Sequence, residues 1–339
     1  MRRQLGLISI ASGAFFLSLA PLVKFYVADQ VVLAPLNRYN LTRLEARGAT
    51  YFDTATLKTR SGATLRATNT VRGDVRANNG DDDIAVWDST TNIVDLDNPD
   101  KPIQVQGYRM AFDRRSSELV NCCGSNVDGD NSVRMTGYGL LWPLANVEKR
   151  DYPFFDMTTR QAQPMRFIAE DEVRGLPVYR FVQQIPKTKT ASVDTRLPGS
   201  MLGLGAKSKP QKVDRYSEAT ISVWVDPRTG IPVKHQQNIH STVQTPDGRG
   251  RMTVASARLV TIDADQKSLV DMTKGKAFQI SAVRALIPVG SLLLGVILLL
   301  TGAIALVSAR NHRPAPPEAP RRADGKFGDP SARPHVNHQ

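Results

Sequence analysis

The chain has 339 residues, of which 41% are hydrophobic, 22% charged and 6% aromatic. This composition excludes an acidic disordered protein and a fibrous repeat. The apolar residues are concentrated in two uncharged runs, residues 5–23 and 285–309, and these runs exclude a simple soluble cytosolic enzyme.

Each apolar run is long enough to cross a bilayer core as a helix, which takes about 20 residues. The first run begins after Arg2 and Arg3 and has the pattern of a secretory signal peptide as well. Its small-residue site at 18–20 is followed directly by Pro21, which is a poor context for cleavage, so we expect an uncleaved anchor. The second run is too long for an ordinary buried core helix. We therefore predict two transmembrane helices over these runs.

The short basic flanks predict the orientation, because Lys and Arg accumulate on the cytoplasmic side of a membrane. Residues 1–4 and the tail 310–339 are both basic, so we expect both termini in the cytoplasm and residues 24–284 outside it. The tail is rich in Pro, Arg and Ala and is predicted to be disordered. Part of the net charge of +12 lies in the exported segment, where anionic lipids or acidic glycans, not nucleic acid, are the available partners.

Each apolar run contains small residues four positions apart. They are Ser9 and Gly13 in the first run, and Ser291 and Gly295 in the second. This spacing lets two helix backbones approach closely, so the two helices are candidates to pack on each other through these faces. Small residues are also common in membrane helices that do not pair in this way.

Residues 24–284 show short alternating apolar runs separated by turn residues, which is the pattern of an antiparallel sheet. The clearest hairpin lies at 224–234, where Asp226 and Gly230 occupy turn positions. One helix is expected, over 265–284, leading directly into the second apolar run. We predict a mainly β, barrel-like extracytoplasmic domain with no internal linker. The best strand candidates are 83–87, 108–112, 177–182, 219–225 and 251–262.

One long polar segment, 187–212, carries an apolar tip. The tip contains Leu197, Met201, Leu202 and Leu204. Exposed apolar side chains on a long loop are unfavourable in water unless they pack on something. Either the tip folds back onto the core of the domain, or it contacts lipid or gates a cavity.

No constellation of catalytic or metal-ligating residues is found. His235 and His240 are five positions apart on a predicted strand, so their side chains point to opposite faces and do not form a joint metal site. The acidic groups at 81–83, 128–130 and 170–172 are expected in polar turns and on a strand edge. We expect neither an enzyme nor a bound metal or cofactor.

Cys122 and Cys123 are the only cysteines, and they are adjacent. Thiols exported into an oxidising compartment tend to be paired. A bond between them closes a small ring that rigidifies one turn. A redox-active pair, free thiols and bonds to another chain are the alternatives.

A series of short motifs occurs along the chain in a specific order. They are RRQLGL at 2–7, TYFD at 50–53, VWDS at 86–89, DRR at 113–115, NCCG at 121–124, EKRDYP at 148–153, GLPVYRF at 175–181 and WVDPRTG at 224–230. Together they resemble an actinobacterial two-pass envelope family known as the porin PorA family. The resemblance covers nearly the whole chain except the tail.

The resemblance has several implications for function. A porin needs a closed membrane barrel or an oligomeric helical pore, whereas this chain has two ordinary membrane helices. Its topology is similar to that of class B scavenger receptors and lysosomal integral membrane proteins, which hold or pass lipids in an apolar tunnel. The hairpin at 224–230 looks like one in bacterial lipoprotein-carrier folds.

We therefore expect a non-enzymatic envelope protein that binds or transfers a lipid or another hydrophobic ligand. The alternatives are a channel component formed by homo-oligomerisation and a scaffold for envelope biosynthesis.

Overall fold

The computed structural model describes residues 2–311. The chain forms two compact units, a β domain over Leu19–Gly290 and a helical unit over the described residues up to Ser18 and from Ser291 onward. The tail predicted to be disordered, 310–339, lies almost entirely outside the described residues.

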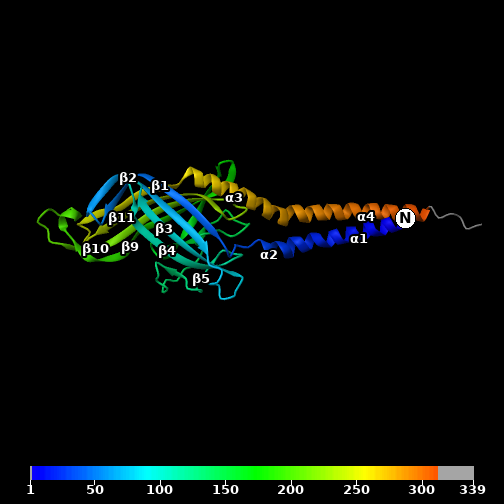
Figure 1. The fold of residues 1–339 in the computed structure, drawn as a ribbon, viewed down its shortest axis with the longest axis horizontal. Helices are drawn as coiled ribbons and strands as arrows, with labels where there is room; N and C mark the ends of the chain where they lie inside the picture. Colours follow the sequence, from blue (N-terminus) through cyan, green and yellow to red (C-terminus); the bar gives the residue numbers. More distant parts are fainter. Residues whose placement is uncertain (1, 312–339) are drawn as a thin grey trace, which may run out of the picture. The chain divides into compact units, whose positions relative to one another are not determined.

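The β domain is built on one large antiparallel sheet of twelve strands, so the predicted mainly β fold is confirmed. The sheet is curled into a half-barrel of long strands (Figure 1). The strand order is β5-β4-β3-β2-β1-β12-β11-β10-β9-β8-β7, with β6 paired to β4. The strands are β1 (Tyr39–Asp53), β2 (Lys58–Gly73), β3 (Ile84–Asp95), β4 (Asn98–Asp113), β5 (Leu119–Val120), β6 (Asn126–Val127), β7 (Tyr152–Asp156), β8 (Gln161–Val173), β9 (Leu176–Leu197), β10 (Gln211–Val225), β11 (Pro232–Gln244) and β12 (Arg251–Thr261).

A short segment around Tyr138 joins the two edges of the sheet. The backbone N–H of Leu119, in β5, donates to the carbonyl of Gly137 at 2.7 Å. On the other side, the N–H of Tyr138 donates to the carbonyl of Pro153, in β7, at 2.8 Å. The curled sheet is therefore closed at this level, although β5 and β7 do not pair with each other directly.

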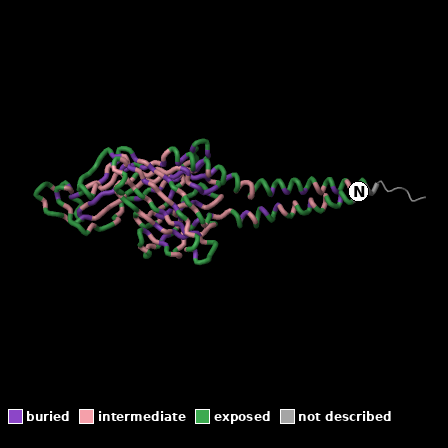
Figure 2. The backbone as a smooth tube through the Cα atoms, viewed as in Figure 1, coloured by how far each residue is buried: buried purple, intermediate pink, exposed green. Residues whose placement is uncertain are grey.

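The concave face of the sheet is packed with apolar side chains. Trp87 and Met110 belong to a cluster on the β2–β4 half, and Phe181 and Val223 belong to one on the β8–β10 half. The segment between β6 and β7 bridges these clusters, because its neighbouring residues Leu141 and Trp142 are buried one in each. Figure 2 shows buried residues running along the strands of this domain.

The predicted hairpin at 224–234 joins β10 to β11. The carboxylate of Asp226 is fully buried and accepts a hydrogen bond from the hydroxyl of Thr229 at 2.9 Å. Gly230 has a φ of 70°, a conformation that favours glycine, and its N–H donates to the carbonyl of Asp226. The turn residues identified in the sequence therefore act as predicted.

The predicted helix near residue 265 is α3 (Asp263–Ser281), which continues through a π-helical segment (Ala282–Leu286) into α4 (Ile287–Asn311). Leu269 of α3 packs with Trp224 and Val178 on the face of the sheet opposite the concave one. At the start of α3 the carboxylate of Asp265 accepts two hydrogen bonds from the guanidinium of Arg43, in β1, at 2.6 and 3.1 Å. The helix is thus held to both halves of the sheet.

The helical unit contains most of α1 (Arg2–Leu22) and α4. Two helical stretches among the described residues, within Gln4–Val27 and Asp263–Ser308, are long and apolar enough to cross a membrane. Inside the unit the two helices lie close together at two glycine pairs. A methyl group built on Gly13 would lie 2.9 Å from the carbonyl oxygen of Gly295, and one built on Gly302 would lie 2.8 Å from that of Gly6.

The residues proposed for helix packing are therefore placed as follows. Gly13 and Gly295 face each other directly, Ser291 is buried, and Ser9 is half-buried. The close contacts repeat every seven residues along each helix, from Gly6 to Gly13 and from Gly295 to Gly302.

Candidate functional site

A row of β-bulges crosses the β domain at one level. Thr50 of β1 pairs with Ser256, Ser256 pairs with His240, and His240 pairs with Glu218 of β10. A β-bulge bends its strand and increases the local twist, so bulges at the same level in neighbouring strands bend the sheet along a line. The register shifts beside this row lie between Ala46 and Ala49, between Ser217 and Ala219, and between Ser241 and Thr242.

An open groove of about 980 Å³ lies along this row. We call it the crease groove. Its polar lining comes from the face opposite the packed concave one, because side chains alternate between faces along each strand. Apolar groups from β8 and β9 line its end. The lining includes Arg47, Arg166, Gln184, Glu218, Thr220, Asn238, His240, Ser256 and Arg258 with the apolar Pro164, Ile168, Val182 and Pro186.

The crease groove carries an excess of positive charge. Arg47, Arg166 and Arg258 are exposed, and none of them forms an ion pair with a carboxylate in the described part of the chain. Arg258 donates only to the amide oxygen of Gln236, at 3.2 Å. Glu218 is the acidic residue of the lining. Guanidinium groups without a partner are suited to bind phosphate or carboxylate.

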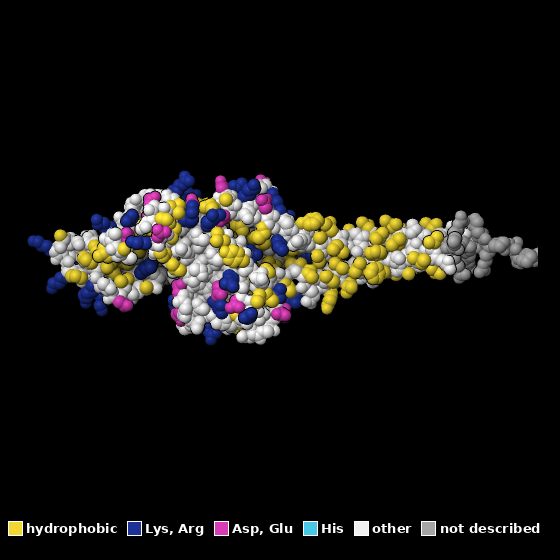
Figure 3. Space-filling view, in the orientation of Figure 1, with side chains coloured by type: hydrophobic (Ala, Val, Ile, Leu, Met, Phe, Trp, Pro, Cys, Tyr) yellow, Lys and Arg dark blue, Asp and Glu magenta, His cyan; other side chains and the backbone are white. Residues whose placement is uncertain are grey.

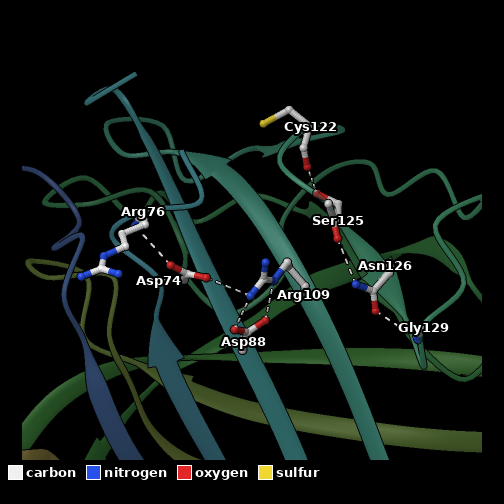
Figure 4. Close-up of polar contacts among 9 residues, drawn as sticks. Asp74, Arg76, Asp88, Arg109, Cys122, Ser125, Asn126 and Gly129 are labelled. Carbon is white, nitrogen blue, oxygen red and sulfur yellow. Dashed lines mark hydrogen bonds and ion pairs between the residues drawn. The ribbon is translucent and has the colours of Figure 1, made fainter. Parts of the chain in front are cut away.

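A second polar cluster surrounds Arg109, in β4. Its guanidinium donates to both carboxylate oxygens of Asp88 at 2.7 and 2.8 Å, and to Asp74 at 3.0 Å (Figure 4). The hydrogen bonds with Asp88 are the main reason why the pKa of Arg109 is raised above its ordinary value. Three of the five N–H groups of this guanidinium are therefore engaged by carboxylates of the fold itself.

The adjacent cysteines lie in a turn next to this cluster. Cys123 has a φ of 62°, and the Sγ atoms of Cys122 and Cys123 are in contact. The turn is stabilised by the hydroxyl of Ser125, which donates to the carbonyl of Cys122 at 2.6 Å (Figure 4). Gly124 lies beside the side chain of Arg109. The cysteines therefore shape the loop that adjoins Arg109.

The two histidines occupy opposite faces of β11, as their spacing predicts. His240 lines the crease groove, whereas His235 pairs with Val223 on the concave face. Burial lowers the pKa of His235 to about 4, so its imidazole is neutral at physiological pH. On the same face, burial together with Glu118 raises the pKa of Tyr138 to about 12.

The apolar tip of the long segment packs onto the domain. Leu202 is 1% exposed and belongs to a cluster with Val213 and Val243. Leu197 and Leu204 are half-buried against the same cluster, and Met201 is half-buried in the same turn. The tip thus follows the first of the two alternatives, folding back onto the domain through Leu202, while Leu197, Met201 and Leu204 keep part of their surface exposed.

The acidic groups noted in the sequence are engaged within the protein. Asp171 accepts a hydrogen bond from the indole of Trp224 at 2.8 Å, which is the main reason for the lowered pKa of this carboxyl. Asp130 pairs with Arg160 at 2.8 Å. Over the described residues 2–311 no group of His, Cys, Asp and Glu side chains is arranged to hold a metal ion.

A family model described as Porin PorA matches residues 5–304, which include most of both apolar helices and the whole β domain. The chain belongs to the Porin PorA family. No significant match is found among curated proteins.

The two apolar helices of this PorA chain limit the kind of pore that it could form. Residues 5–18 and 291–308 contain no charged side chain. Their contact runs through glycine pairs, and large apolar residues such as Phe15, Leu293 and Leu300 are exposed around it. Two helices packed in this way enclose no polar passage.

Sequence reasoning did not find the crease groove of this PorA chain. Its arginines stand far apart in the sequence, at positions 47, 166 and 258, and only the strand order of the sheet places them along one groove. The one local signal is Arg47 followed by Gly48, whose φ of 70° marks a bulge. An isolated pair of this kind is not specific enough to indicate a site.

Proposed function

We propose that this protein is a non-enzymatic, membrane-anchored binding protein of the cell envelope. Its ligand is an anionic amphipathic lipid, whose headgroup lies in the crease groove. The observation that carries this proposal is that Arg47, Arg166 and Arg258 line one groove without a carboxylate partner. The groove falls in the size range of small-ligand sites, about 300–1,000 Å³.

The chemistry of the lining supports a ligand with both polar and apolar parts. The guanidinium groups would neutralise a phosphate or carboxylate, and Gln184 and Asn238 offer amides to its hydroxyl groups. Ile168, which is 48% exposed, and Val182 would contact the first carbons of the lipid chains. In the two-pass topology that we propose, both termini are cytoplasmic and the β domain is extracytoplasmic, where such lipids are available.

The test is lipid retention by the full-length protein purified from membranes in mild detergent. Native mass spectrometry gives the stoichiometry, and extraction followed by lipid mass spectrometry identifies the molecule. We expect one class of anionic lipid at a fixed ratio, and at least a tenfold lower occupancy in the double variant R166E/R258E (about 1.4 kcal/mol).

The matched control is R72E/R76E, which reverses two exposed arginines outside the groove. It should retain lipid as the wild type does. Equal loss in both double variants would mean that net charge alone attracts the lipid, and no retained lipid in the wild type would refute the proposal.

A channel is the second candidate, and the family description favours it. Because residues 5–18 and 291–308 carry no charged side chain, conduction through these helices requires several copies of the chain around a shared lumen. Planar-bilayer recording of the purified protein should then show discrete conductance steps together with a defined oligomer in native mass spectrometry. A monomer without conductance would eliminate this candidate.

A further inference from the structure

One end of the β domain forms a small lobe of its own, which we call the basic lobe. It comprises residues 187–216 and the β11–β12 turn at 243–253. Its core is the cluster of Leu202, Val213 and Val243. Because Leu202 is buried there, the connection between β9 and β10 is packed as part of the lobe.

The surface of the basic lobe is rich in unpaired cations. Residues 187–212 contain six Lys and Arg but a single acidic residue, Asp194. Lys189 is paired with Asp214 and Arg249 with Asp247. Arg215 is half-buried and donates to the hydroxyl of Ser241. The other basic side chains are exposed and have no ion pair within the described residues; they are Lys187, Arg196, Lys207, Lys209, Lys212 and Arg251. Figure 3 shows Lys and Arg gathered at this end of the domain, on the left of the view.

The same surface lacks the groups that insert into a bilayer. Between Ile168 and Phe278 no large aliphatic or aromatic side chain of the described chain is exposed. Proteins that dock on membranes usually combine basic residues with exposed apolar ones. The lobe instead exposes hydroxyl groups, including those of Ser192 and Thr195. A surface that carries basic side chains and hydroxyl groups, but no exposed large apolar side chain, is suited to bind a hydrated polyanion.

A second hollow, of about 420 Å³, connects this surface to the crease groove. It shares Glu218 and His240 with the groove and is also lined by Lys187, Tyr216 and Arg251. The ammonium group of Lys187 lies 5.2 Å from the centre of the Tyr216 ring. An aromatic ring beside cationic and amide groups is the combination that binds a charged sugar.

We propose that the basic lobe binds an acidic polysaccharide, with one sugar seated in the hollow beside Tyr216 and the chain lying along the exposed lysines. The proposal stands apart from lipid binding in the crease groove, since the cations that carry it, such as Lys187, Lys207 and Lys209, do not line that groove. Each exposed cation contributes a modest electrostatic attraction, so the affinity depends on their number and decreases steeply with salt.

The test measures binding of fluorescein-labelled dextran sulfate to the full chain in zwitterionic nanodiscs, with uncharged dextran as the negative control. The variant K207E/K209E/K212E removes three lobe lysines, and K267E/K274E/K276E reverses three exposed lysines of α3 as the matched control. Basic residues from Arg310 onward are the same in all three proteins. Fluorescence anisotropy is recorded at about 50 mM and about 200 mM salt.

We expect the lobe variant to lose at least about tenfold in affinity and to show a smaller salt dependence, while the α3 variant stays within about twofold of the wild type. The groove variant R166E/R258E should bind the polymer as the wild type does, even where it has lost lipid. Equal losses in the lobe and α3 variants would overturn the proposal, as would undetectable binding by the wild type. Sedimentation with sucrose-loaded phosphatidylglycerol vesicles provides the contrast: vesicle binding that needs the lobe lysines, without polymer binding, would assign the lobe to a membrane surface instead.

Discussion

The arginines of this protein carry the same guanidinium group but lie in two different environments. Arg109 makes three short hydrogen bonds to Asp74 and Asp88, so its charge is neutralised within the fold. Arg166 and Arg258, in the crease groove, have no carboxylate partner in the described part of the chain. An arginine that is paired with carboxylates stabilises the fold, whereas an arginine without a carboxylate partner is available to a ligand. Pairing therefore distinguishes the two kinds of arginine better than position or exposure does.

The largest expected effect is on the paired arginine. Arg109→Ala leaves Asp74 and Asp88 facing each other without a cation, which should lower the free energy of unfolding by about 1–2 kcal/mol at this partly exposed site. Thermal denaturation followed by tryptophan fluorescence measures the loss. Arg76→Ala is the control, because in this region it is the backbone N–H of Arg76 that contacts Asp74. Equal stability of both variants would show that the pairing around Arg109 does not contribute.

An effect of similar size is expected from pH. The imidazole of His235 stays neutral in the folded protein down to a pKa of about 4, whereas in the unfolded chain it takes up a proton near its ordinary pKa of 6.5. The unfolded state therefore binds more protons between these values, and stability falls as the pH drops through this window, by ~1–2 kcal/mol for a half-buried ring. His235→Gln should flatten that part of the pH profile of Tm. An unchanged slope in the variant would assign the acid sensitivity to other groups.

The unpaired arginines should contribute almost nothing to stability. Arg166→Ala and Arg258→Ala remove exposed cations that hold no carboxylate, so the free energy of unfolding should change by less than about 0.5 kcal/mol. The same variants should weaken retention of an anionic lipid. Chemical denaturation and lipid extraction from one preparation give both values. A destabilisation as large as that of Arg109→Ala would abolish the distinction between the two environments.

The smallest effect concerns the turn beside Arg109. We predict that Cys122 and Cys123 are bonded to each other, so the intact mass should rise by a pair of hydrogen atoms on reduction, with no change in oligomeric state. Replacing both by Ser should leave stability within about 0.5 kcal/mol, since a bond between neighbours restrains little of the unfolded chain. Labelling of free thiols in the unreduced, denatured protein would contradict the prediction.

Local features of this fold were readable from the sequence because they depend on neighbouring residues. The hairpin at 224–234 depends on Asp226 and Gly230, and the strand segments depend on alternation along a few positions. The apolar helices depend on length and composition alone. In each case the determinant lies within one short window of the chain.

The candidate site could not be predicted from the sequence, because it depends on how strands that are distant in the chain pair in the sheet. Arg47, Arg166 and Arg258 lie along one groove because of the order in which distant strands pair, and no short window contains two of them. The tip at Leu202 presented the related problem, since its partners Val213 and Val243 lie on other strands. The composition of the segment shows that its tip is apolar, but only the three-dimensional packing shows which side chains the tip covers.

The pairing of β1 with β12 has a consequence for biosynthesis. The link between Arg43 and Asp265 joins residues 222 positions apart, so the sheet cannot be completed until its last strand has been made. At ordinary rates of translation this takes roughly 10–40 seconds, during which the meander from β1 to β4 presents an open strand edge to other nascent chains. The edge of β1 that pairs with β12 therefore stays without its partner strand until synthesis has passed Thr261.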